Sequence, residues 1–185
     1  MAIFAVVIAT VALLPVFLCV FKKRSSVRII SLIVFAIYLF GNFSFTLLNR
    51  EVMSDQYVVL QPLQDFHSAF YLDLGFIGTI NRMFSEGIGP VLQTIHINRG
   101  EMAREVLLNI LLYIPMGYLL PFISKALRQT GLIVMIGFLC SCATEFAQLY
   151  FQIGCFQLDD IVCNTIGTLI GAVLGITLAG LWRVK

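Results

Sequence analysis

Apolar residues dominate this chain in five runs, and the stretches between the runs carry most of the charged residues. The runs cover residues 2–21, 29–48, 105–124, 131–151 and 159–182. Each is close to the roughly 20 residues that a helix needs to cross the core of a bilayer. The pattern therefore predicts an all-α fold, a polytopic transmembrane helix bundle with about five spans.

The composition agrees with a protein embedded in lipid. Of the 185 residues, 59% are hydrophobic and 12% charged, and the mean hydropathy is +0.96. A soluble domain is usually about half apolar and about a quarter charged. We expect a single membrane domain over 1–185, with two spans in 1–48, an outer loop in 49–104 and a three-span core in 105–185. A net charge of +2 gives no sign of a nucleic-acid partner.

Basic residues gather in the connections on one side of the predicted bundle. Eight of the twelve Lys and Arg residues follow the first, third and fifth runs without an acidic neighbour, namely Lys22, Lys23, Arg24, Arg28, Lys125, Arg128, Arg183 and Lys185. Basic connections of this kind normally lie in the cytoplasm. We therefore expect a multi-pass protein whose N-terminus lies outside and whose C-terminus lies inside.

The outer loop, 49–104, carries an amphipathic pattern. Apolar residues recur at helical spacing at five positions, Leu63, Phe66, Phe70, Leu74 and Ile77. This pattern predicts a helix that lies in the membrane interface. Gly87, Gly89 and Pro90 break it, and a short apolar piece follows at 91–97. A lid over the outer mouth and a helix that only shields the bundle fit this pattern equally well.

The third run has polar residues at its outer end and prolines further along. Asn109 lies about one turn inside the membrane, and Arg104 lies at the outer end. Pro115 and Pro121 each remove one hydrogen bond from the helix, so a kink is expected there. The carbonyls that lose a donor need another partner, because lipid supplies none.

The fourth run carries polar residues on one helical face. The residues Ser141, Thr144, Glu145, Gln148 and Gln152 recur at helical spacing. Such a face is expected to meet protein or water rather than lipid. Interhelical packing alone does not require a carboxylate, so Glu145 favours a functional face.

The fifth run begins with acidic residues and continues with small ones. Asp160 and Asn164 share a face with Gly167, Gly171 and Gly175. Small residues at this spacing let a neighbouring helix approach closely, either within the chain or in a dimer. The outermost acidic residue, Asp159, is interpreted as a cap that interacts with the helix dipole.

Topology brings these polar residues together. The short connection between the fourth and fifth runs makes them antiparallel neighbours. The residues expected at similar depth in the outer half are Asn109, Glu145, Gln148, Asp160 and Asn164. They predict a polar pocket that opens outwards at the level of the lipid headgroups. Arg104 or Arg99 is the nearest candidate for a cation beside Glu145. No spacing typical of a metal site is found, and we expect neither metal nor cofactor.

Three segments resemble the VanZ-like family of bacterial membrane proteins. They are NILLYIPMGYLLP from 109, TEFAQ from 144 and DDIVCNTIGTLIG from 159. The matching positions are Asn109, Pro115, Gly117, Glu145, Gln148, Asp160, Asn164, Gly167 and Gly171. The resemblance covers about 104–175 and implies a protein of the bacterial cytoplasmic membrane. The founding member is associated with resistance to teicoplanin, an acylated glycopeptide antibiotic, and no reaction is firmly assigned to the family.

Three functions follow from these observations. The first is a non-enzymatic envelope protein that binds an amphiphile, such as a lipoglycopeptide or a lipid-linked precursor, and lowers antibiotic accumulation. The second is an enzyme that modifies a lipid or cell-wall precursor, with Glu145 and Asp160 as acid and base. The third is a small transporter of lipids or small molecules, although no internal repeat is evident. Membrane lipids are partners in all three, and the oligomeric state stays open.

Overall fold

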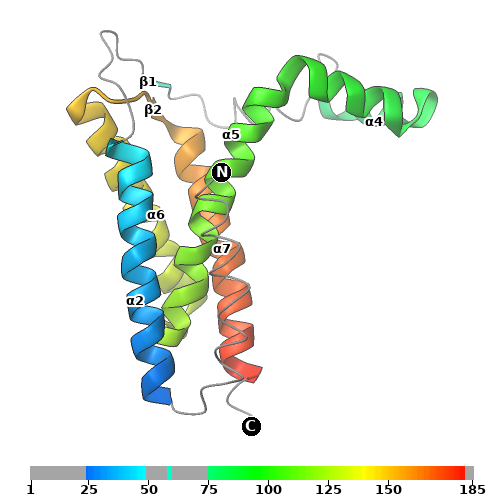
Figure 1. Cartoon of the computed structure of the whole chain (residues 1–185). Coiled ribbons are helices and arrows are strands. Elements are labelled where there is room, and N and C mark those ends of the chain that lie inside the picture. The colour runs from blue at the N-terminus through cyan, green and yellow to red at the C-terminus, as the bar shows by residue number, and fades with distance from the viewer. Residues whose placement is uncertain (1–23, 49–57, 60–74, 182–185) are drawn as a thin grey trace.

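The computed structural model describes residues 24–48, 58–59 and 75–181, and these form a helical bundle with a side arm (Figure 1). The described elements, in chain order, are α2 (Arg24–Phe43), the π-helix η1 (Ser44–Leu48), β1 (Val58–Val59), α4 (Gly75–Glu86), α5 (Ile88–Ile123), the 3-10 helix η2 (Ala126–Arg128), α6 (Thr130–Phe151), β2 (Phe156–Gln157) and α7 (Leu158–Leu181). The predicted first span, the predicted interfacial positions 63–74 and the end of the fifth run lie outside the described residues.

Four described helices are long and apolar enough to cross a membrane. They cover Ser25–Leu47, Arg104–Ile123, Thr130–Phe151 and Leu158–Leu181. These correspond to the second, third, fourth and fifth predicted runs. Large apolar side chains such as Ile33, Phe138 and Val173 are exposed on the outside of the bundle, while polar ones such as Glu145 are buried. Exposed apolar side chains and buried polar ones are the arrangement expected of helices surrounded by lipid. The predicted all-α transmembrane bundle is confirmed.

Helix α5 is longer than the sequence pattern indicated. It is continuous over 36 residues, Ile88–Ile123, whereas we expected a break around 87–90 followed by a separate short piece. Only Gly87 interrupts the backbone, at φ 87° before the first residue of α5. Pro90 falls in the first turn of α5, where a missing N–H costs little because the first N–H groups have no helical partner. The N-terminal part of α5 leaves the bundle together with α4 (Figure 1).

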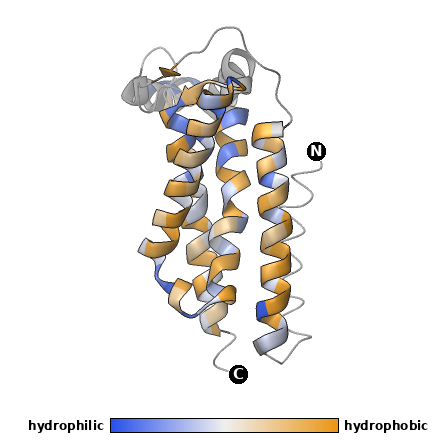
Figure 2. Cartoon of the chain, turned by 90° about the vertical axis from the view of Figure 1, so that its left-hand side faces the viewer, coloured by the Kyte–Doolittle hydropathy of each residue, from blue (hydrophilic) through white to orange (hydrophobic). Residues whose placement is uncertain are grey.

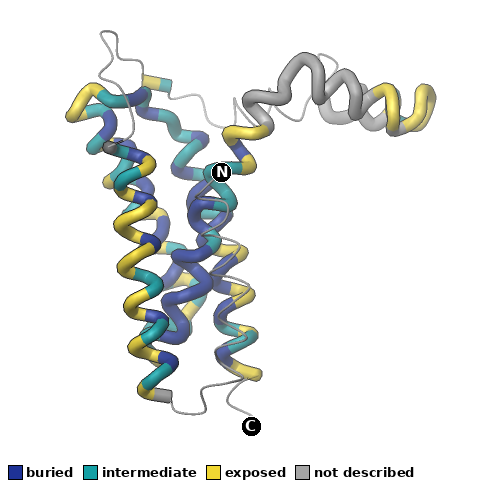
Figure 3. Tube along the Cα trace, in the orientation of Figure 1, coloured by how far each residue is buried: buried dark blue, intermediate teal, exposed yellow. Residues whose placement is uncertain are grey.

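The centre of the bundle is the C-terminal half of α5. Its side chains Tyr113, Met116 and Leu119 are at most 1% exposed, and they pack against α2, α6 and α7 in two apolar clusters. Figure 3 shows this stretch as buried along its length, while α2 exposes its outer side. Helix α5 is therefore the central helix of the bundle, and α2, α6 and α7 pack around it.

Helices α5 and α7 pack backbone against backbone. A Cβ atom added to Gly167, Gly171 or Gly175 of α7 would lie closer than 3.0 Å to the main chain of α5, and one added to Gly117 would meet the main chain of α7 in the same way. Residues at these positions need to be glycine because nothing larger fits. The small-residue face, for which both an internal contact and a dimer were open, is thus used inside the chain.

The bundle has two chemically different ends. We call the end with Arg28, Lys125 and Arg128 the basic end, and the opposite end, where α6 meets α7, the polar end. At the polar end β1 and β2 form a short parallel pair, with Val58 opposite Phe156 and Val59 opposite Gln157. Hydrophilic residues mark both ends of the bundle and apolar residues the length between them (Figure 2).

Candidate functional site

The candidate site is a group of six polar residues from α5, α6 and α7 at the polar end. We call it the polar cluster, and its members are Asn109, Ser141, Glu145, Gln148, Asp160 and Asn164. Each member forms at least one hydrogen bond to a group on another element. The structure thus brings together residues that are up to 55 positions apart in sequence. The predicted ligand-binding residues all belong to this group except Arg104.

The polar face of α6 points into the bundle. Ser141 is fully buried, and Glu145 and Gln148 are each 2% exposed. Thr144 lies at the edge of this face and bonds back to the carbonyl of Cys140. The outermost predicted member, Gln152, behaves differently, because it is exposed and adopts a left-handed conformation that ends α6. The inward face therefore spans two turns rather than three.

Glu145 is held by the connection that follows α6. Its Oε2 accepts a hydrogen bond of 3.0 Å from the backbone N–H of Gln157, in β2. Phe156, also in β2, packs its ring 5.4 Å from that of Phe146 on α6. The buried carboxyl group thereby has a main-chain donor, which a buried polar group requires.

Asp160 and Asn109 join α7 to α5. The Nδ2 of Asn109 donates to Oδ1 of Asp160 at 2.5 Å, and both side chains are partly buried. The neighbouring Asp159, predicted to interact with the helix dipole, is only 4% exposed. Both acidic residues lie in the first turn of α7, where the helix dipole favours negative charge.

Asn164 joins α7 to α6. Its Nδ2 donates to the Oγ of Ser141 at 2.8 Å, and its own backbone carbonyl accepts from Thr168. Thr168 is fully buried because its side chain fills the space beside Gly137 of α6. The polar cluster thus continues directly into the tightly packed part of the bundle.

A second set of polar residues, which the sequence analysis did not identify, extends the cluster to α2 and η1. Tyr38 donates to the carbonyl of Leu112 at 3.0 Å and accepts from Asn42. Thr46 bonds back to Asn42, and its backbone carbonyl accepts from Nε2 of Gln148 at 3.1 Å. Their spacing of four residues places Tyr38 and Asn42 on one face of α2, with Thr46 following in η1, and was the available signal for this link.

Three buried acceptor oxygens in this region have no hydrogen-bond donor among the described residues. They are Oδ1 of Asn42, Oε1 of Gln148 and Oδ1 of Asn164. A buried acceptor left unpaired costs about 1–3 kcal/mol, so such groups normally meet water or a ligand. Each of the three amides donates through its nitrogen to a protein acceptor, whereas its oxygen has no donor among the described residues.

The remaining predicted residues lie at the periphery or in the helix packing. Arg104 is exposed and makes no ion pair with Glu145 in the part of the chain that the structure describes; the side chain of Arg99 lies outside it. Pro115 and Pro121 are buried inside continuous α5. The carbonyl of Pro121 accepts from the Nε of Arg128. Within the described ranges, no group of three His, Cys, Asp or Glu residues is arranged to hold a metal ion.

Four apolar helices with an amide- and carboxylate-rich interior at one end define a polytopic membrane protein with a candidate binding site for a polar group. The model of the VanZ/LLP1 family matches residues 27–179, most of the chain. The protein therefore belongs to the VanZ/LLP1 family. The match begins in α2, upstream of the segments that carry the sequence resemblance, and it includes every member of the polar cluster. Neither the comparison with curated proteins nor that with solved structures finds a match.

Proposed function

We propose that this VanZ-like membrane protein is a non-enzymatic binder in the bacterial envelope, which lowers the accumulation of lipophilic glycopeptide antibiotics of the teicoplanin type. The observation that carries this proposal is the set of three unpaired acceptor oxygens on Asn42, Gln148 and Asn164. Unpaired acceptors suit a ligand rich in hydroxyl and amide donors. An acylated glycopeptide carries such donors, and its acyl chain stays in the surrounding lipid.

The position of the cluster supports an outward-facing site. The polar end lies opposite the basic end, and basic connections normally lie in the cytoplasm. In this orientation the C-terminus is inside, and the polar cluster lies in the outer half of the bilayer. A ligand arriving from the outer leaflet would enter beside η1 and β2, since these segments hold Gln148 and Glu145.

The chemistry of the carboxylates favours binding over catalysis. Glu145 accepts from a backbone N–H and Asp160 from the amide of Asn109. Both carboxyl groups thus hold elements of the bundle together, and this structural use supports binding rather than catalysis.

The test is antibiotic susceptibility in a sensitive Gram-positive host that expresses the protein at a measured membrane level. We expect wild type to raise the inhibitory concentration of teicoplanin but not of vancomycin, which lacks the acyl chain. Asn164→Leu and Gln148→Leu should lose this protection because each removes an unpaired acceptor. Glu86→Gln on α4, an exposed carboxylate changed to an amide, is the control and should protect like wild type.

Two results would contradict the proposal. One is full protection by both amide variants at equal membrane levels, which would remove the acceptors from the mechanism. The other is a chemically modified lipid or wall precursor that mass spectrometry finds in cells with wild type and not in cells with Asp160→Asn. That result would establish an enzyme instead.

A further inference from the structure

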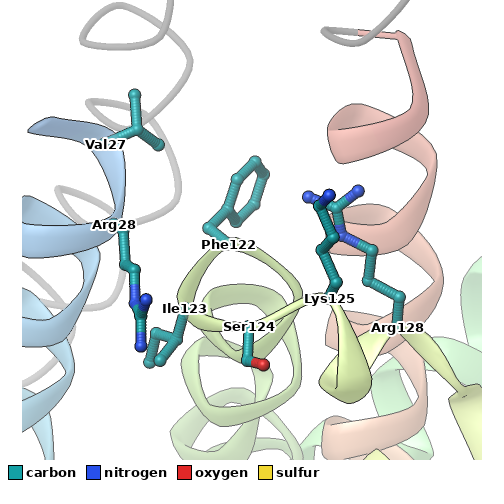
Figure 4. Close-up of a pocket in the computed structure, with 7 residues that line it drawn as sticks. All are labelled: Val27, Arg28, Phe122, Ile123, Ser124, Lys125 and Arg128. Atoms are coloured by element: carbon teal, nitrogen blue, oxygen red, sulfur yellow. The ribbon is translucent and has the colours of Figure 1, made fainter. Parts of the chain in front are cut away.

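The basic end contains a cavity that is separate from the polar cluster. It has a volume of about 340 Å³ and lies between the start of α2 and the connection from α5 to α6. Its basic residues are Arg28 on α2 and Lys125 and Arg128 in the connection, and its apolar lining includes Val27, Phe122 and Ile123. Figure 4 shows the basic side chains on both sides of Phe122 and Ile123. We call this cavity the basic cleft.

Arg28 and Lys125, two of the three basic residues of the cleft, have no acidic neighbour among the residues that line it. No lining residue is acidic. Arg28 lies one turn inside α2, and neither α2 nor α6 has an acidic residue in its first turn. The N-terminus of a helix already carries a partial positive charge, so the side chains add to it. Such an arrangement is stabilised when an anion binds.

One of the basic groups is held in place by the fold. The Nε of Arg128 donates to the carbonyl of Pro121 at 3.0 Å. That carbonyl belongs to the last turn of α5, whose oxygens have no partner within the helix. The contact orients the guanidinium group, and a planar guanidinium in a fixed orientation is well suited to a phosphate.

The surroundings of the basic cleft are those of a lipid rather than of a soluble anion. Val27 and Phe122 present apolar surface inside it, and both are buried. Ile29 and Ile33, on the same part of α2, are each 56% exposed and continue this surface along the outside of the bundle. An acyl chain can follow these side chains while its headgroup stays in the cleft.

We propose that the basic cleft is a binding site for an anionic phospholipid, whose phosphate lies between Arg28 and the Lys125–Arg128 side chains. Basic cavities between transmembrane helices are a known mode of headgroup recognition. The site is independent of the proposed function at the polar end, and it does not depend on which side of the membrane the basic end faces.

The experiment uses the purified full chain in neutral detergent, with binding measured by native mass spectrometry. The probes are short-chain phosphatidylglycerol, phosphatidylcholine with the same acyl chains, and inorganic phosphate. We expect phosphatidylglycerol to bind at least about tenfold more tightly than phosphatidylcholine, because two or three basic groups each contribute about fivefold. Inorganic phosphate should bind more weakly than phosphatidylglycerol or not at all.

The variants test whether this preference comes from the basic cleft. Arg28→Gln/Lys125→Gln should weaken phosphatidylglycerol binding by about 25-fold, since both side chains are exposed and each charge contributes about fivefold. Arg28→Lys/Lys125→Arg conserves the charges and should retain binding, which excludes misfolding as the cause. Arg82→Gln removes one charge from α4, away from the cleft, and should leave binding unchanged.

Three outcomes would overturn the proposal. Equal affinity for the two lipids would show that the cleft does not recognise the negative headgroup. Unchanged binding in Arg28→Gln/Lys125→Gln would place the lipid elsewhere. Inorganic phosphate that binds as tightly as phosphatidylglycerol would identify a site for a free anion.

Discussion

The glycine face of α7 offers a direct test of the packing on which the whole bundle depends. A Cβ on Gly171 would meet the carbonyl of Ile114 and would lie 2.8 Å from the backbone nitrogen of Tyr118, while ordinary contacts of a Cβ begin at 3.4 Å. Both partners are main-chain atoms of α5, so no side-chain rotation relieves the clash. In Gly171→Ala the two helices therefore have to move apart.

The size of the effect follows from two opposing terms. Overpacking of a close-packed interior costs about 1–3 kcal/mol, and a gap of about 0.5–1 Å forfeits a quarter to a half of each dispersion contact along the interface. Replacement of glycine by alanine also favours the helix by about 1 kcal/mol. Gly180→Ala, on the same helix, gains helix propensity without a steric clash, because no atom lies within 4 Å of its added Cβ.

The assay is unfolding of the purified protein in mixed micelles by increasing SDS, followed by circular dichroism. The propensity gain cancels between the two variants, so the free energy of unfolding of Gly171→Ala should lie about 1–3 kcal/mol below that of Gly180→Ala. Equal free energies would refute the reasoning. So would a change in oligomer mass without a loss of stability, which would assign the glycine face to a contact between copies.

Two further predictions concern the polar end and the topology. Glu145→Leu should lower the free energy of unfolding by about 1–3 kcal/mol because it leaves the N–H of Gln157 without an acceptor, whereas Glu145→Gln retains a carbonyl oxygen and should cost less; equal losses in the same SDS titration would contradict this account. In a cysteine-free background, a membrane-impermeant thiol reagent applied outside cells should label Ser85→Cys on exposed α4 and not Ala126→Cys at the basic end, and the reverse pattern would overturn the proposed orientation.

The apolar runs predicted the helices of the bundle well, because every segment that crosses a membrane must meet the same requirement of length and backbone hydrogen bonding. A helix of about 20 residues buries its own backbone groups, so the apolar runs gave the described spans to within a few residues. The start of α5 was missed for the same reason. Polar residues such as Arg99 and Glu101 mark the edge of the lipid, but they do not end a helix, and α5 continues through them.

The composition of the site was more predictable than its contacts. Helical spacing correctly placed Glu145 and Gln148 on one inward face, and antiparallel topology brought α6 and α7 together. The hydrogen-bond donor of each acceptor could not be predicted, because the spacing of residues along one helix does not show which groups of other segments lie opposite. Gln148 bonds to the main chain of Thr46, which is 102 positions away in sequence, and Asp159 is buried in the first turn of α7. Such contacts follow from tertiary packing alone.

The pairing of β1 with β2 has a mechanical consequence. Val59 is opposite Gln157, and the N–H of Gln157 is bound to Glu145. The segment after α2 is therefore connected, through one short strand, to a carboxylate inside the bundle. A movement of β2 away from α6 would therefore disturb both the strand pairing and the hydrogen bond to Glu145. The strand pair and the carboxyl group of Glu145 thus form one connected unit at the polar end.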